Sequence, residues 1–211
     1  MHVHVLPGGP IPTNAYLLTS PPAGEAVLVD APEGAWGLVR PVLEAERCQL
    51  RRLWLTHGHW DHTQGAAEVV RRTGAEVSAH RADQPLIETP EVMAGFHLPG
   101  VVLEPVRVDW WLEDGDSLEA LGETVRVRHV PGHCPGSLLF HFAASGAAFS
   151  GDALFRDGIG RTDLPGGDFD TLERSIRTRI YSLPDATTVY PGHGEPTTVG
   201  REKGANPYVR A

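Results

Sequence analysis

The sequence predicts an α/β protein built from stacked β-sheets with helices on the outside. Short apolar runs bounded by turn residues recur along the chain, helical patterns separate some of them, and each half supplies strands followed by a helix. No internal repeat or linker-like tract divides the chain. At 211 residues, of which 41% are hydrophobic, the chain suits one well-filled core, and we expect a single domain over residues 1–211.

Strands are predicted where apolar runs end at turn residues. In the first half these runs are NAYLLTS (14–20), EAVLVDAP (25–32), RRLWLTHG (51–58) and AEVSAH (75–80). In the second half they are TVRVRHVPG (124–132), SLLFHF (137–142), AAFSGD (147–152) and TTVYPGHG (187–194). Several runs are too continuously apolar for a half-exposed strand, which favours sheets covered on both faces.

Helical patterns occupy three intervening regions, residues 34–47, 65–73 and 168–183. In the last region an apolar stripe with helical spacing marks a buried face. Its members are Leu172, Ile176, Ile180 and Leu183. Residues 84–105 lack a clean period and contain several prolines, so we expect a surface loop there, with a flap over a site as the alternative.

The composition limits the classes of binding partner that the chain can have. The net charge of −9 and the lack of any basic run argue against nucleic-acid binding, although a local basic pocket for a small anion stays open. No secretory leader and no apolar run of about 18 residues is visible, so no membrane association is expected. Cys48 and Cys134 form no CxxC pair, which favours a reduced, cytoplasmic protein, and Cys134 is expected to be a small buried residue.

The stretch WLTHGHWDHTQG, residues 54–65, concentrates potential metal ligands. His57 and His59 follow a predicted strand, and Asp61 and His62 open the next helix. Burying such groups is costly unless each finds a partner. Imidazole and carboxylate suit zinc, iron and manganese. A single ion cannot easily use all four groups from so tight a loop, which suggests two neighbouring metals.

Three more candidate ligands lie at the ends of other predicted strands. His133 follows TVRVRHV, Asp152 ends AAFSG, and His193 follows TTVY, each beside glycine or proline. Loops at strand ends carry function in α/β folds, and strand ends gathered at one rim converge on one cleft. We therefore expect these residues to complete the site that begins at residue 57.

The ordered set of motifs HxHxDH, PGHxPGS, SGDxLF and PGHG resembles the metallo-β-lactamase-fold hydrolases. This resemblance runs from PTNAYLL to the C-terminus and implies a four-layer αββα sandwich of two mixed sheets flanked by helices. The stretches IGRTDLPGGD (159–168) and TTVGREKGANPY (197–208) are similar to the short glyoxalase II-like, or hydroxyacylglutathione hydrolase-like, branch.

The resemblance implies two divalent metal ions, with zinc expected first and iron or manganese as alternatives. It assigns the first metal to His57, His59 and His133. It assigns the second metal to Asp61, His62 and His193, with Asp152 bridging the two. An anionic bridge offsets the repulsion between two dications about 3.5–4 Å apart.

Such a site fits thioester hydrolysis. Two metals that share a water can generate hydroxide near neutral pH and polarise the carbonyl it attacks. Asp61 could orient that hydroxide, and a thiolate leaving group needs little protonation because thiol pKa values lie near about 8.5. The resemblance implies a small-molecule substrate of the S-2-hydroxyacylglutathione type, such as D-lactoylglutathione. Since only 18 residues follow His193, we do not expect the C-terminal region with which longer relatives hold glutathione, and the oligomeric state is not indicated.

Other activities stay open. A persulfide dioxygenase of the same fold would hold a single iron through His57, His133 or its neighbour, and Asp152. A lactonase, a β-lactamase, a ribonuclease and a non-catalytic metal-binding protein are less favoured alternatives. The bridging Asp152 speaks against a β-lactamase, and the acidic charge balance disfavours a ribonuclease.

Five residues are weaker candidates for support or substrate binding. Asp30 in VLVDAP either hydrogen-bonds a ligand histidine or serves as a turn residue before the next helix. Arg161 and Asp163 in GRTDLP are expected to pair at the rim, with a direct substrate role less favoured. Arg201 and Lys203 in GREKG either bind a carboxylate of the substrate or lie at a solvated helix start.

Overall fold

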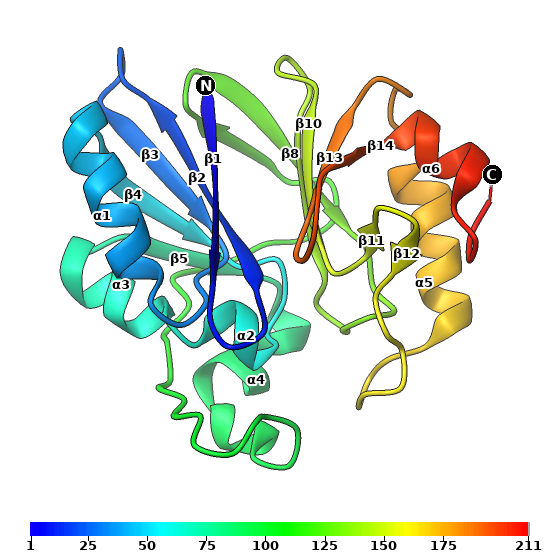
Figure 1. Ribbon diagram of the computed structural model, residues 1–211, viewed down its shortest axis with the longest axis horizontal. Helices are drawn as coiled ribbons and strands as arrows, with labels where there is room; N and C mark the ends of the chain where they lie inside the picture. The colour runs from blue at the N-terminus through cyan, green and yellow to red at the C-terminus, as the bar shows by residue number, and fades with distance from the viewer. Residues whose placement is uncertain (211) are drawn as a thin grey trace.

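The computed structural model describes residues 1–210, in which two six-stranded β-sheets pack against each other and helices cover their outer faces (Figure 1). Strands of the N-terminal half form one sheet and strands of the C-terminal half form the other. Each sheet contains both parallel and antiparallel pairs. The predicted four-layer αββα sandwich of mixed sheets is confirmed.

The first sheet contains strands from residues 2–111. They are β1 (His2–Gly8), β2 (Thr13–Ser20), β3 (Glu25–Val29), β4 (Gln49–Trp54), β5 (Glu76–Ala79) and β6 (Trp110–Trp111). The order across the sheet follows the chain, β1-β2-β3-β4-β5-β6. Strands β3 to β6 are parallel to one another, so their carboxyl ends meet at one edge.

The second sheet has the order β14-β13-β10-β9-β8-β7. Its strands are β7 (Ser117–Ala120), β8 (Glu123–His129), β9 (Leu138–Phe142), β10 (Ala147–Gly151), β13 (Thr188–Pro191) and β14 (Thr197–Thr198). A separate hairpin joins β11 (Leu154–Phe155) to β12 (Gly158–Ile159). The parallel pair β10–β13 brings the ends of two ligand-bearing strands together.

The helices differ in length and place. The longer ones are α1 (Ala35–Glu46), α3 (Ala66–Thr73), α5 (Phe169–Ser175), continued by the π-helical turn η3 (Ile176–Ile180), and α6 (Val199–Ala205). Short ones are α2 (Trp60–Thr63), η1 (Arg81–Asp83), α4 (Gln84–Glu88) and η2 (Pro90–Met93). Figure 1 shows α1 and α3 outside the first sheet, α5 and α6 outside the second, and α2 and α4 at the lower edge.

Three apolar layers form the core. The layer between the sheets includes Trp54, which stacks on Phe140 with ring centroids 4.9 Å apart. A second layer packs α1 and α3 on the first sheet, and a third packs α5 on the second through the predicted stripe that begins at Leu172. Burial of these side chains from water is the main stabilising contribution to such a sandwich.

Eight strands and three longer helices lie where the sequence predicts them. Strands β1 and β7 were missed because most of their side chains are exposed or half-exposed, and β6, β11, β12 and β14 are two residues long. Residues 84–105 are not the plain surface loop we expected, since α4 and η2 lie within them. Among the described residues, no helix has the length and apolar character needed to cross a membrane.

Candidate metal centre

Seven histidine and aspartate side chains converge at the edge where the carboxyl ends of several strands meet. His57 and His59 lie in the loop after β4, and Asp61 and His62 lie on α2. The other three come from the second sheet. They are His133 after β8, Asp152 at the end of β10 and His193 after β13. The structure thus brings together all seven residues that the motifs single out.

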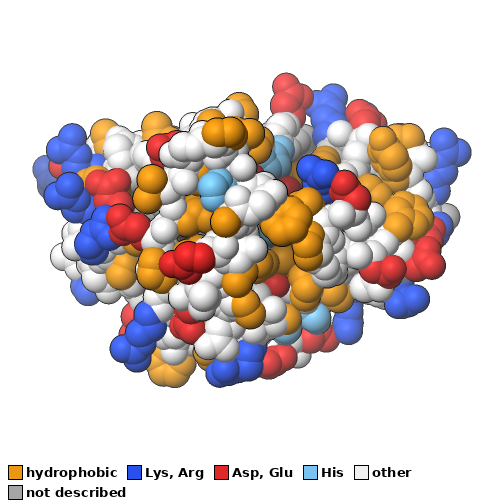
Figure 2. Space-filling model, turned by 90° about the horizontal axis from the view of Figure 1, so that it is seen from below, with side chains coloured by type: hydrophobic (Ala, Val, Ile, Leu, Met, Phe, Trp, Pro, Cys, Tyr) orange, Lys and Arg blue, Asp and Glu red, His pale blue; other side chains and the backbone are white. Residues whose placement is uncertain are grey.

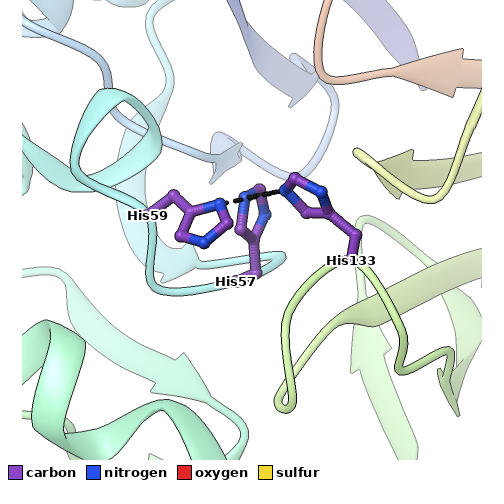
Figure 3. Close-up of side chains that lie close together, drawn as sticks. All are labelled: His57, His59 and His133. Carbon is purple, nitrogen blue, oxygen red and sulfur yellow. Dashed lines mark hydrogen bonds between the residues drawn. The ribbon is translucent and has the colours of Figure 1, made fainter. Parts of the chain in front are cut away.

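Three of these histidines point their rings at one another (Figure 3). Nδ1 of His59 lies 2.9 Å from Nε2 of His133, which lies 3.3 Å from Nε2 of His57. One ring nitrogen from each of these histidines lies within 4.8 Å of the other two, so a single ion could bind all three. Imidazole nitrogens bind zinc at about 2.0–2.1 Å, so three nitrogens this close can surround one ion.

A second group lies beside the first. Asp61, His62 and His193 also place their donor atoms within 4.8 Å of one another. Nε2 of His193 lies 3.2 Å from Oδ2 of Asp61. The carboxylate of Asp152 touches both groups, because Oδ2 lies 3.6 Å from Nε2 of His133 and 3.4 Å from Nε2 of His193.

Hydrogen bonds behind the cluster fix which nitrogen of each ring faces inward. Nδ1 of His133 donates to the carbonyl oxygen of Arg161 at 2.8 Å, and Nδ1 of His193 donates to that of Pro12 at 2.9 Å. Nδ1 of His62 donates to Asp30 at 2.8 Å. In each case Nε2 is left to face the cluster, as in metal-binding histidines, whose other nitrogen donates to a carboxylate or carbonyl.

Asp30 organises two of the ligands at once. Besides His62, its carboxylate accepts hydrogen bonds from the Thr56 amide at 2.7 Å and the Thr56 hydroxyl at 2.8 Å. The single hydroxyl proton of Thr56 is thereby used, so its oxygen can accept from Nδ1 of His57, 3.0 Å away. Asp30 adopts a left-handed φ of 59°, a strained conformation that its hydrogen bonds hold in place.

The donor set fits divalent cations. Nε2 of His62 and Oδ1 of Asp152 are buried 3.2 Å from each other, and no other group in the described residues hydrogen-bonds to either atom, which is costly for polar atoms. Because Nδ1 of His62, His133 and His193 donates away from the cluster, Nε2 of each ring faces its centre, where a cation would stabilise the arrangement. Imidazole and carboxylate together are ligands typical of zinc, iron and manganese.

The electrostatics of the cluster keep its carboxylates ionised and favour positive charge beside them. Burial and the neighbouring histidines hold the pKa of His57 well below its usual range. Burial would raise the pKa of Asp152, but His62 and His193 outweigh it and keep that pKa well below its ordinary value. Burial would lower the pKa of His193, but Asp152 and Asp61 raise it to about 10. The carboxylates therefore hold a cation in this place, as a metal ion would be held.

Two glycines let the backbone approach the cluster. A Cβ at Gly192 would lie 2.0 Å from Oδ1 of Asp152 and 2.6 Å from Cε1 of His62. A Cβ at Gly160 would lie 1.9 Å from the carbonyl oxygen of Asp152. Gly192 in the PGH motif and Gly160 in the GRT motif therefore leave no room for a side chain at this site.

A cavity of about 800 Å³ opens on the cluster. Its polar floor consists of His59, Asp61, His133, Asp152 and His193. One wall comes from residues 86–98 of the segment 84–105, which we call the cap segment. It contributes Leu86, Val92, Met93, Phe96, His97 and Leu98. The flap alternative for this segment thus describes its position better than a plain loop does, and Figure 2 shows hydrophobic side chains gathered over this face.

The weaker candidates separate into two groups. Arg161 lines the cavity and pairs with Asp163 through two hydrogen bonds of 2.7 and 2.6 Å. Arg201 and Lys203 do not line it, contrary to the substrate-binding option for them. They lie on α6 beyond the short edge strand β14, where Arg201 pairs with Asp157 and Lys203 with Asp185. Their charges are therefore already partnered.

Several supporting residues were not found from the sequence. Asn14 donates to the carbonyl oxygens of Pro191 and Gly194 and so holds the loop that carries His193. Asp83 is fully buried and binds the loops of two ligand motifs. The signal for Asn14 is an amide at the start of the otherwise apolar run NAYLL, whereas Asp83 stands in a region with no apolar period.

The fold and the cluster together define a class of protein, an αββα sandwich with a histidine- and aspartate-rich metal-type centre at the strand ends. A family model described as the metallo-beta-lactamase superfamily matches residues 8–193. The chain belongs to this superfamily.

Relatives extend the match to the full chain. The hydroxyacylglutathione hydrolase GloC of Haemophilus influenzae is 35% identical, over 100% of this chain and 99% of its own. The crystal structure of the B3 metallo-beta-lactamase BLEG-1 is similar at 36% identity and a TM-score of 0.92, over 100% of both chains. That of TTHA1623 in a di-iron-bound form is similar at 36% identity and a TM-score of 0.82, over 98% of this chain and 100% of the other.

Proposed function

We propose that this chain is a binuclear metal-dependent hydrolase that cleaves thioesters of the S-2-hydroxyacylglutathione type. One observation carries the proposal: two adjacent ligand groups share the carboxylate of Asp152 at the floor of a cavity large enough for a small molecule. The name of the GloC relative supports the thioester reaction, and the di-iron form of TTHA1623 supports a two-metal centre. We propose zinc as the first metal to test, with iron and manganese as alternatives.

Each ligand group would bind one of the two metal ions. His57, His59 and His133 would hold one cation, Asp61, His62 and His193 the other, and Asp152 both. Bound metals would lower the pKa of a shared water and polarise the thioester carbonyl. Asp61, whose Oδ2 lies 3.2 Å from Nε2 of His193, would accept a hydrogen bond from that water. The departing thiolate needs no general acid, because thiol pKa values lie at about 8.5.

The test combines metal analysis with a substrate panel on one preparation. We expect about two metals per chain, release of thiol from lactoylglutathione, and loss of that activity after chelation with recovery on adding zinc. A protein with one iron per chain that consumes oxygen with glutathione persulfide would instead establish the dioxygenase alternative. A fully metallated protein inactive on every thioester would reject the proposal.

β-Lactam hydrolysis is a second candidate because the BLEG-1 structure, similar over the whole chain, is titled a B3 metallo-beta-lactamase. Ring opening of a chromogenic cephalosporin by the same preparation tests it. The free, buried thiols of Cys48 and Cys134 support a reducing compartment, and we propose the cytoplasm as the location.

A further inference from the structure

The wall of the cavity differs in chemistry from its floor. Beside the cap segment, the wall is formed by Ile11, Trp60, Phe155, Ile159, Leu164 and Pro165. Four side chains at its mouth stay exposed in spite of their apolar character. They are Ile11 at 39%, Val92 at 50%, Phe96 at 51% and Leu98 at 43%. Exposed apolar side chains gathered around one opening mark a binding surface.

Positive charge is scarce on that wall. Of the described residues, Arg161 contributes the one lysine or arginine side chain that lines the cavity. Its guanidinium is already engaged by both carboxylate oxygens of Asp163. His97, the histidine of the cap segment, directs Nδ1 at the carbonyl oxygen of Leu98, 2.9 Å away.

Glutathione would meet this wall with two carboxylates. A carboxylate that loses water needs a cationic or hydrogen-bonding partner, and the walls offer it the already paired Arg161. Arg201 and Lys203 are paired elsewhere. The chain's net charge of −9 adds a general repulsion toward an anionic carrier.

An uncharged, apolar carrier would fit this wall without leaving a charged group unpaired. Each methylene that it buries against Met93, Phe96 or Phe155 raises affinity by about four-fold. Predominantly apolar walls with a few polar groups at one end are the usual form of a small-molecule site. Here the polar end is the metal-type floor, where the reacting carbonyl would bind, and the apolar walls are left for the rest of the substrate.

We propose that the cavity selects thioesters whose thiol carrier is uncharged and largely apolar, in preference to the dicarboxylate glutathione. This inference rests on the proposed thioesterase function but replaces glutathione with an uncharged thiol as the preferred carrier at the same site. The acyl carbonyl lies at the floor, and the carrier runs out between the cap segment and residues 155–165.

Two substrates with the same acyl group on the same cysteinyl sulfur test the inference. One is S-lactoylglutathione and the other is its N-acetyl diethyl ester, in which all three charges are masked while the acylated sulfur is unchanged. We expect kcat/KM of the metal-loaded protein to be at least about ten-fold higher for the neutral compound. Its two esterified carboxylates no longer carry charges that lose water against an apolar wall. An equal or lower value would overturn the inference.

A pair of variants at the cap provides the matched control. Phe96→Lys places a cation at the mouth and should narrow the preference for the neutral substrate by about two- to five-fold, whereas the uncharged Phe96→Met should change that preference by less than Phe96→Lys does. If both variants change the preference equally, the charge argument is wrong.

Binding separates this inference from the proposed function. Calorimetry with S-hexylglutathione and its N-acetyl diethyl ester requires no hydrolysis. Tighter binding of the neutral thioether, in a protein that cleaves no thioester, would reject the thioesterase while keeping the cavity's selectivity. Equal or tighter binding of the charged thioether would overturn the selectivity itself.

Discussion

The floor and the cap of the cavity face the same space but are held in different ways. At the floor, ligand side chains are fixed by buried hydrogen bonds from residues such as Asp30 and Thr56. The cap segment consists of short helical turns whose apolar side chains are half-exposed at the opening. The comparison teaches that the proposed metal chemistry lies where buried hydrogen bonds fix the side chains, while the proposed carrier selection lies where exposed side chains have few fixed partners.

The largest effect should come from removing the shared carboxylate. Asp152→Ala deletes the group that contacts both ligand sets, so metal content and activity should fall together. We expect activity to drop by more than about 100-fold, since even residues behind metal ligands contribute about 10- to 100-fold to metal affinity. Elemental analysis and thiol release on the same sample check this result. An active, fully metallated Asp152→Ala protein would contradict the bridging assignment.

A pair of glycine substitutions tests the rigidity of the floor against the openness of the cap. Gly192→Ala places a methyl group 2.0 Å from Asp152, so the carboxylate must move and metal affinity should fall by about 100-fold. Gly95→Ala in the cap meets no atom within 4 Å and should change metal affinity by less than about two-fold. Chelator competition measures both. Equal effects would remove the distinction between floor and cap.

The same contrast explains what the sequence could predict. His57, Asp152 and His193 were identifiable because each ends a strongly apolar run beside glycine or proline, so the local pattern fixes both element and position. Asp83 was not identifiable, because its partners Gly58 and Gly136 lie 25 and 53 residues away and contribute backbone amides, which every residue except proline has. The cap segment was expected to be a loop because its sequence has no helical or strand period. Its position is determined instead by packing against residues that are distant in the sequence.

Asp83 connects the two regions and should give an intermediate effect. Its carboxylate accepts from the Gly58 amide at 2.8 Å, inside the HGH motif, and from the Gly136 amide at 2.6 Å, beside His133, and it stands immediately before α4 and the cap. Asp83→Asn keeps one acceptor and directs an NH₂ group at the other donor. We expect about 1–3 kcal/mol lower unfolding free energy and about ten-fold weaker metal binding.

Denaturant unfolding and chelator competition measure the two effects of Asp83→Asn separately. If metal binding weakens with KM of the neutral thioester unchanged, Asp83 acts on the floor. A rise in KM with unchanged metal affinity would show that Asp83 acts on the cap segment instead. It would disprove the inference that Asp83 holds the two ligand loops together.

The smallest effect should follow substitution of Cys134, although it stands next to the candidate ligand His133. Its thiol is fully buried and donates to Asp83 at 3.1 Å, and burial and Asp83 raise the pKa of that thiol far above its ordinary range. A group so resistant to ionisation is a poor nucleophile and a poor ligand. Cys134→Ser preserves the donor and should keep metal content and kcat within about two-fold of the parent, whereas Cys134→Ala removes it and should lower the unfolding free energy by about 1 kcal/mol. If Cys134→Ser loses metal while its unfolding free energy is unchanged, the thiol itself belongs to the centre, and the floor extends one residue further than its hydrogen bonds indicate.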